Sequence, residues 1–372
     1  MIRLTAMLLM FSFVASCAGE VEPAAVWPLN VQVTSAVATP DGAMLFYARG
    51  TMYRVDGESG PEVIATGTEA SDGKPGRSRN RFLTEFSPGC FIAEDSRNRM
   101  VLLHRNADDL VLNYLDTAAH ADDLDQLMME GFIQPPQEGL ALFCNHDQEV
   151  LAFSPDGKLQ WSFMTGGRPQ ASCMPDDNHV MVFSTDGNLY GLDGAGQLQW
   201  ILETDYTGGF NSLGYACFLK DGKLHCADRD GNILWSKVIE AQLLGSMVIA
   251  SPLAENICFN STSNLFCYSA SGDELWRLRH ESVSFDSYYY GRISPDNCVI
   301  LVRSVRVIEG ILGRSTSQTY GQVQSIRVYG PDGHVINELR EINFIWPSMA
   351  PGLNGTLYLI DDKAGEIEVY RP

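Results

Sequence analysis

The feature that most constrains the fold of this chain is a short motif that occurs four times. Each copy places a glycine four residues before a tryptophan, and successive tryptophans are 39, 35 and 41 residues apart. The pairs are Gly157 with Trp161, Gly196 with Trp200, Gly231 with Trp235, and Gly272 with Trp276. This period fits one four-stranded propeller blade better than a helical repeat of about 33 or 34 residues.

Turn signals between and around the motifs favour an all-β fold. Nine Asp-Gly dipeptides punctuate the chain, and this dipeptide is the preferred tight turn of a β-hairpin. The intervening segments are short and alternating or β-branched, as in strands. Weaker copies extend the array in both directions. We therefore predict one β-propeller domain over residues 26–372.

The two ends of the chain are expected to share one blade. The last copy, in residues 348–372, supplies three strands, and the segment 26–33 has no blade of its own. Pairing the ends would close the ring and leave no exposed sheet edge. The prediction is eight four-stranded antiparallel blades. Seven is the alternative, because the second blade is poorly marked.

The N-terminus has the pattern of an export signal. Arg3 precedes an apolar stretch over residues 6–14 that is too short to span a bilayer. The residues Val14-Ala15-Ser16-Cys17 resemble the lipobox of bacterial lipoproteins, which implies a signal peptide at 1–16, acylation of Cys17 and a lipidated tether at 17–25. An ordinary signal peptide with an accidental cysteine is the alternative. Within this resemblance, Ala18 after the cysteine favours the outer membrane, facing the periplasm.

The charge restricts the partners. The formal net charge is −20 at pH 7, so nucleic acid and anionic membrane would both repel the chain. We expect no nucleic-acid partner, and membrane contact through the N-terminal lipid alone. The expected partner is an envelope protein.

Two cysteine pairs have the same spacing of nine residues. An Asp-Gly turn at 221–222 would set Cys217 opposite Cys226, and a turn at 262–263 would set Cys258 opposite Cys267. We predict a disulfide in each hairpin, which suits an exported protein. A zinc site is the alternative, although the gap between cysteines is wider than is usual for zinc ligands.

The tryptophan segments also carry a family resemblance. Those preceded by Leu-Tyr-Gly-Leu-Asp (189–193) and Leu-His-Cys-Ala-Asp (224–228) resemble the quinoprotein-type repeat, over roughly residues 145–280. This repeat builds the eight-bladed pyrroloquinoline quinone (PQQ) dehydrogenases and PQQ-free relatives, which include a propeller lipoprotein of the outer-membrane barrel-assembly machine. The resemblance implies that the glycine–tryptophan pairs pack neighbouring blades together.

Signals for catalysis are missing from the sequence. There is no Cys-Cys dipeptide, as the PQQ enzymes have, and no G-x-S-x-G, H-E-x-x-H or Walker motif. We expect no catalytic residue, cofactor or metal. The prediction is a non-enzymatic, lipid-anchored scaffold for protein–protein interaction, with outer-membrane protein assembly as the role implied by the resemblance. A PQQ-type dehydrogenase or a propeller that binds a small ligand or glycan is the alternative.

Three segments outside the repeat are candidates for binding, because propellers bind through loops. Residues 66–81 are polar and basic, and residues 305–322 lengthen a hairpin of the seventh blade. In residues 116–131 the helical spacing of Leu124, Leu127 and Met128 predicts a short helix, with calcium binding by nearby aspartates as the alternative.

Overall fold

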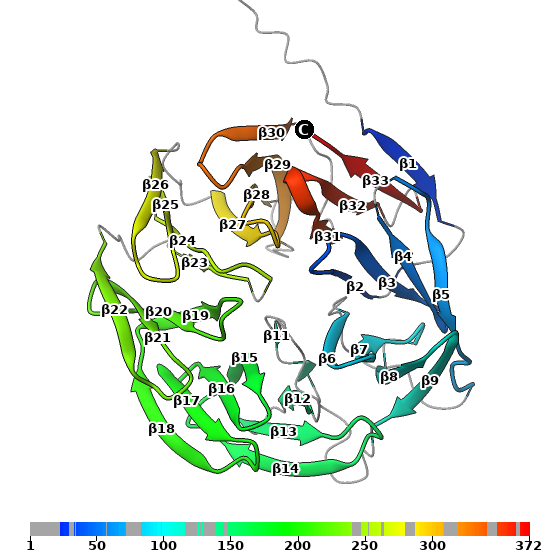
Figure 1. The fold of residues 1–372 in the computed structure, drawn as a ribbon, viewed down its shortest axis with the longest axis horizontal. Helices are drawn as coiled ribbons and strands as arrows, with labels where there is room; N and C mark the ends of the chain where they lie inside the picture. The colour runs from blue at the N-terminus through cyan, green and yellow to red at the C-terminus, as the bar shows by residue number, and fades with distance from the viewer. Residues whose placement is uncertain are drawn as a thin grey trace, which may run out of the picture.

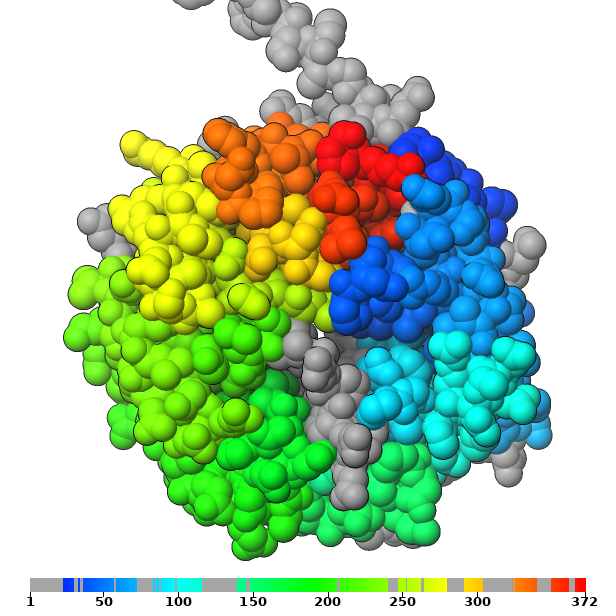
Figure 2. Space-filling view, in the orientation of Figure 1, coloured from blue at the N-terminus to red at the C-terminus, as the bar shows by residue number. Residues whose placement is uncertain are grey.

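The computed structural model shows a ring of antiparallel sheets (Figure 1). The blades follow one another round the ring in chain order, as the colour sequence of Figure 2 shows. The structure describes residues 23–372 apart from 30–32, 34, 57, 72–82, 98, 116–124, 127, 130–138, 145–147, 240–246, 252, 262–263, 280–286, 309–318, 341–347 and 362–364.

Within these described residues the strands form eight four-stranded units, as predicted. The first four blades are β2–β5 (Ser35–Ala38, Met44–Ala48, Thr51–Val55, Glu62–Thr66), β6–β9 (Thr84–Ser87, Cys90–Glu94, Met100–Asn106, Asp109–Tyr114), β10 and β12–β14 (Asp125–Gln126, Ala141–Cys144, Glu149–Phe153, Leu159–Met164), and β15–β18 (Pro169–Asp176, His179–Ser184, Asn188–Asp193, Leu198–Glu203).

The remaining blades complete the ring. They are β19–β22 (Tyr206–Phe210, Ala216–Lys220, Lys223–Ala227, Ile233–Val238), β23–β26 (Met247–Ile249, Ile257–Asn260, Asn264–Tyr268, Glu274–Arg279), β27–β30 (Ser287–Ile293, Val299–Ile308, Thr319–Tyr329, Val335–Arg340), and β31–β33 (Ser348–Pro351, Leu357–Asp361, Glu366–Tyr370) with β1 (Ala25–Pro28). A short 3-10 helix covers Leu353–Gly355.

Two sheets depart from the simple four-stranded pattern. The first and second blades are joined by one parallel bridge between Thr66 and Asp109, so their strands form a continuous eight-stranded sheet. The two-residue strand β11 (Met128–Met129) adds in parallel to β15 of the fourth blade. The helix expected within 116–131 is therefore wrong for its described part, because residues 125–126 and 128–129 pair as strands with β12 and β15.

The ring closes through its two ends, as predicted. Strand β1 pairs antiparallel with β33, with Val26 opposite Glu368 and Trp27 opposite Ile367. The closing strand covers only Ala25–Pro28, less than the expected 26–33. The pairing makes the N-terminal strand the outermost strand of the last blade (Figure 1).

The middle strands of each blade form the core. Strand β3 is buried at every position, whereas the outermost strands β14, β18 and β22 alternate between exposed and half-buried side chains. A middle strand is covered on both faces by neighbouring blades, so it takes an apolar run rather than an alternating pattern.

The four predicted tryptophans lie at blade junctions. Each ring contacts the positive-φ glycine in the last turn of the next blade, where a Cβ atom would come within 2.5 to 2.9 Å of the ring. The contacts join Trp161 to Gly196, Trp200 to Gly231, Trp235 to Gly272, and Trp276 to Gly333. Each indole Nε1 also donates a hydrogen bond to the carbonyl two residues before that glycine, over 2.8 to 3.1 Å.

At the junctions that lack such a tryptophan, other side chains make the contact between blades. Asn113 Nδ2 donates to the Pro155 carbonyl over 3.0 Å, two residues before Gly157. Asn337 Nδ2 donates to the Arg371 carbonyl over 3.2 Å. At the closing junction Trp27 lies 3.5 Å from the position of a Cβ atom at Gly60. The roles of Asn113 and Trp27 are not predicted by the repeated motif.

The hairpin register of both cysteine pairs is as predicted. Cys217 is opposite Cys226, and Cys258 is opposite Cys267. Asp221 and Gly222 have φ values of 50° and 68°, as a type I′ turn requires. The disulfide bonds themselves are not present.

All eight cysteines of the described chain are buried thiols. The Sγ atoms of Cys217 and Cys226 are 3.5 Å apart, whereas a bonded pair is separated by about 2.05 Å. In this state the sulfurs pack as small apolar groups beside the docking tryptophans.

Candidate interaction face

The connections between strands divide the ring into two faces. Because the four strands of a blade alternate in direction, the turn between its second and third strands and the connection to the next blade emerge on the same side. We call this side the connection face; its described residues include 67–71, 95–97, 99, 165–168, 185–187, 204–205 and 221–222. The opposite side, the turn face, carries the glycine turns that receive the tryptophans.

Hydrogen bonds fix the connections to the turns that lie beside them on this face. Thr165 Oγ1 donates to the Gln148 carbonyl over 2.7 Å, which fixes the connection after β14. The Asp221 amide donates to Asp205 Oδ2 over 2.6 Å, which fixes the connection after β18 to the turn of the fifth blade. The connections are therefore part of the rigid ring where they are described.

Described parts of two of the three predicted binding segments reach this face. Residues 67–71 follow β5, and the paired ends of β28 and β29 point to the same side. Of residues 116–131, the described residues 125–126 and 128–129 belong to strands β10 and β11 instead. The extended hairpin of the seventh blade is confirmed, because β28 and β29 stay paired out to Ile308 and Thr319. The tips at 309–318, and the basic residues Lys74, Arg77, Arg79 and Arg81, lie outside the described residues.

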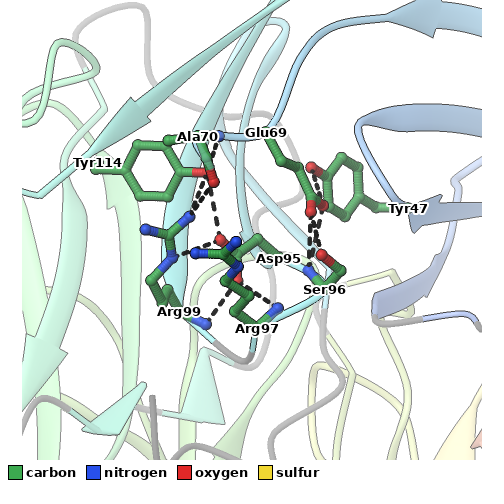
Figure 3. A network of polar contacts seen from close by, with 8 residues as sticks. All are labelled: Tyr47, Glu69, Ala70, Asp95, Ser96, Arg97, Arg99 and Tyr114. Carbon is green, nitrogen blue, oxygen red and sulfur yellow. Dashed lines mark hydrogen bonds and ion pairs between the residues drawn. The ribbon is translucent and has the colours of Figure 1, made fainter. Parts of the chain in front are cut away.

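A polar network anchors the start of the first segment between the first and second blades (Figure 3). Half-buried Glu69 accepts a hydrogen bond from Tyr47 Oη over 2.9 Å. It also accepts bonds from the Ser96 amide over 3.2 Å and from the Ser96 hydroxyl. Glu69 therefore ties the connection to strand β3 on one side and to the β7–β8 turn on the other.

The second half of the network is centred on Asp95, which is fully buried. Asp95 accepts bonds from Arg99 Nε over 2.7 Å and from Tyr114 Oη over 3.3 Å. The Ala70 amide donates to Tyr114 Oη over 3.0 Å, and Arg99 donates to the Ala70 carbonyl. The Arg99 guanidinium also lies over the Tyr114 ring, 4.4 Å from its centre.

The pKa shifts of the tyrosines in this network indicate a structural role rather than a reactive centre. Burial, reinforced by Glu69, raises the pKa of Tyr47. Burial also raises the pKa of Tyr114. Both phenols are therefore neutral donors at physiological pH, and neither is an activated nucleophile. The network can hold residues 67–71 in a fixed position.

A similar arrangement occurs between the third and fourth blades. The Gly166 amide donates to Tyr190 Oη over 3.1 Å, and Tyr190 Oη donates to Asp186. Burial opposes ionisation of Asp186, but hydrogen bonds from Tyr190 and Asn188 keep its pKa below the ordinary value. A tyrosine and an aspartate thus hold the connection at two separate junctions.

The turn face has two small cavities, of about 320 and 440 Å³, beside Trp161 and Trp200. Trp200 lies between Gly231 of the next blade and Gly191 of its own, where a Cβ atom would come within 2.0 Å of the ring. Trp200 is therefore in close contact with the glycine backbone of two neighbouring blades.

The described residues contain neither a cluster of metal-binding side chains nor a membrane-spanning helix. No group of three or more histidine, cysteine or acidic side chains is arranged to hold a metal ion there. No described helix is long and apolar enough to cross a membrane. Cys17 lies outside the described part of the chain.

Comparison with known proteins places the fold. No protein-family model and no curated protein matches the sequence. Among solved structures, BamB from Moraxella catarrhalis matches with a TM-score of 0.51 and 13% identity, over 94% of this chain and 99% of that one. The chain is a β-propeller similar to BamB. The propeller domain of Cps50 (Swd1) from Myceliophteria thermophila has a TM-score of 0.49 and 10% identity, over 82% of this chain and 98% of that one.

The likeness to BamB extends over 94% of the chain. The predicted glycine–tryptophan pairs and cysteine pairs belong to the blades and their junctions, whereas the candidate surface is formed by the connections. Tyr47, Glu69, Asp95, Arg99 and Tyr114 were not identified from the sequence, because they belong to no repeated motif.

Proposed function

We propose that this protein is a non-enzymatic, lipid-anchored propeller scaffold of the cell envelope that binds a protein partner through its connection face. The observation that supports the proposal is that residues 67–71 and the extended hairpin of β28 and β29, which lie outside the repeat, reach the same face of the ring. The BamB-like fold supports the envelope setting and a role in outer-membrane protein assembly.

The anchoring part of the proposal rests on the lipobox-like sequence before Cys17. We expect Cys17→Ser to move the protein from the membrane fraction to the soluble fraction of the envelope and to abolish incorporation of a labelled fatty acid. Retention of the label by the variant would contradict lipidation at Cys17.

The binding part is tested by site-specific cross-linking in the native envelope. A photoreactive residue at exposed Ser71 on the connection face should capture a partner protein, which mass spectrometry would identify. The matched control is exposed Lys158 on the turn face. Equal capture from both positions, or capture from Lys158 alone, would show that the connection face is not the binding surface.

A further inference from the structure

The two buried cysteine pairs occupy equivalent positions in adjacent blades. In the fifth blade Cys217, Cys226 and Trp235 lie opposite one another on β20, β21 and β22, and in the sixth blade Cys258, Cys267 and Trp276 do so on β24, β25 and β26. Each pair therefore lies beside the tryptophan that docks its blade on the next one.

The same positions in other blades show that packing does not require cysteine. The third blade has Leu142 and Ala152 there, and the fourth has Met181 and Gly191. The position on the third strand takes a small residue because the tryptophan ring lies beside it. An apolar residue on the second strand and a small one on the third are sufficient, so paired thiols are a special feature of two blades.

The strand geometry allows each pair to bond. In the hairpin closed by Lys220 and Lys223, Cys217 and Cys226 occupy a non-hydrogen-bonded position, where Cα atoms are separated by about 4.5 Å. Disulfides accept Cα separations of about 4.4 to 6.8 Å. The sulfurs, now 3.5 Å apart, can therefore reach bonding distance mainly by side-chain rotation.

Burial determines when the bond can form. All four cysteines have a relative exposure of 0%, so an oxidant cannot reach them once the blades are packed. Burial also raises the pKa of Cys258, which keeps it protonated in the reduced ring. Oxidation must therefore precede the final packing of these blades.

We propose that Cys217 forms a disulfide bond with Cys226, and Cys258 with Cys267, while the chain folds. The two bonds are then buried beside Trp235 and Trp276. A thiolate attacks the disulfide of a thiol–disulfide oxidant and forms a mixed disulfide, which the partner cysteine resolves. One S–S bond forms in the chain and one breaks in the oxidant, which takes two electrons and two protons and leaves as thiols.

The test is to unfold and reduce the full chain and refold it in a buffer of oxidised and reduced glutathione. After the free thiols are alkylated in denaturant, peptide mapping should find these two pairs linked. Both bonds should resist a reductant until denaturant is added, and the oxidised ring should unfold at a higher denaturant concentration than the reduced one. Free thiols at these four positions in the oxidised, folded ring would overturn the proposal.

Two single variants provide the matched controls. Cys226→Ala and Cys267→Ala should fold, because Ala152 fills the same position in the third blade. Each should lose its own bond and keep the other. A disulfide bond between Cys226 and Cys258 would contradict the proposed pairing. Rapid oxidation of a ring that was folded in the reduced state would contradict the proposed timing.

Discussion

At the scale of single residues, the glycine that receives each tryptophan satisfies two separate requirements. Gly231 has a φ of +80°, which disfavours a side chain, and its Cβ position is 2.8 Å from the Trp200 ring. Gly222 has a φ of +68° but no atom within 4 Å of its Cβ position. Comparison of the two sites separates backbone strain from steric clash.

We expect Gly222→Ala to destabilise the ring by about 1 to 2 kcal/mol, the cost of a left-handed backbone. Gly231→Ala carries that strain and also displaces Trp200, so we expect about 1 to 3 kcal/mol more. Denaturant unfolding of the two variants, followed by fluorescence, measures the difference. Equal losses of stability would show that the tryptophan contact contributes little.

A second residue reports on the ring in alkaline solution. Tyr358 is buried between the last and first blades, and its hydroxyl donates to the Gly42 carbonyl over 3.2 Å. Burial, followed by the charge of Asp56, raises the pKa of Tyr358 to about 12. Since its unfolded pKa is about 10, the contribution to stability is complete below about pH 10 and is lost as the pH rises through about 12.

We expect ionisation of Tyr358 to lower the free energy of unfolding by about 2 kcal/mol between about pH 9 and about pH 12. Tyr358→Phe should be less stable at neutral pH by about 1 kcal/mol, through loss of one hydrogen bond. The free energy of unfolding of this variant should also fall less steeply as the pH rises above about 10. Denaturant unfolding at a series of pH values tests both effects, and identical alkaline slopes would contradict them.

At the scale of elements, the sequence predicts the blades best where the tryptophan is present. The donor role that Trp161 shares with Asn113 cannot be recognised from residue type, because only a side-chain N–H in the right place is needed. The spacing of Leu124, Leu127 and Met128 favours a helix, but strand pairing across two blades overrides it.

The polar network was unpredictable for a related reason. Tyr114 reaches Ala70 from 44 residues away, and Tyr47 reaches Glu69 from 22. Such pairs arise only when neighbouring blades bring separate connections together. Local patterns therefore predict each blade, whereas the contacts between connections depend on the whole ring.

The extended hairpin of the seventh blade gives a prediction at this scale. Replacing residues 309–318 with a two-residue Asn-Gly turn should leave the ring folded, because β28 and β29 are paired on both sides of the deletion. Partner capture from Ser71 should fall several-fold if the hairpin contributes to the connection face. Circular dichroism and the unfolding midpoint verify folding, and unchanged capture would exclude the hairpin from the interface.

At the scale of the whole molecule, ring stability depends on a closing strand of four residues. Residues Ala25–Pro28 cover the edge of β33, where Ile367 and Val369 belong to the apolar core. Removing them exposes an apolar strand edge, which favours association between chains.

We expect deletion of residues 23–28 to lower the unfolding midpoint and to produce dimers or larger species in light scattering. The matched variant Trp27→Ala keeps the backbone pairing and loses the side-chain contacts with Gly60 and with the apolar core of this junction. It should stay monomeric and lose about 2 to 4 kcal/mol of stability. A monomeric deletion variant of normal stability would show that the seam is dispensable.

The seam between β1 and β33 also sets the order of events during synthesis. The first strand of the propeller has its partner in the last, with Val26 opposite Glu368. A chain that emerges from the N-terminus can build its middle blades early, but the first strand stays without a partner until β33 is made. A chain truncated before β33 therefore retains an open strand edge that quality control can recognise.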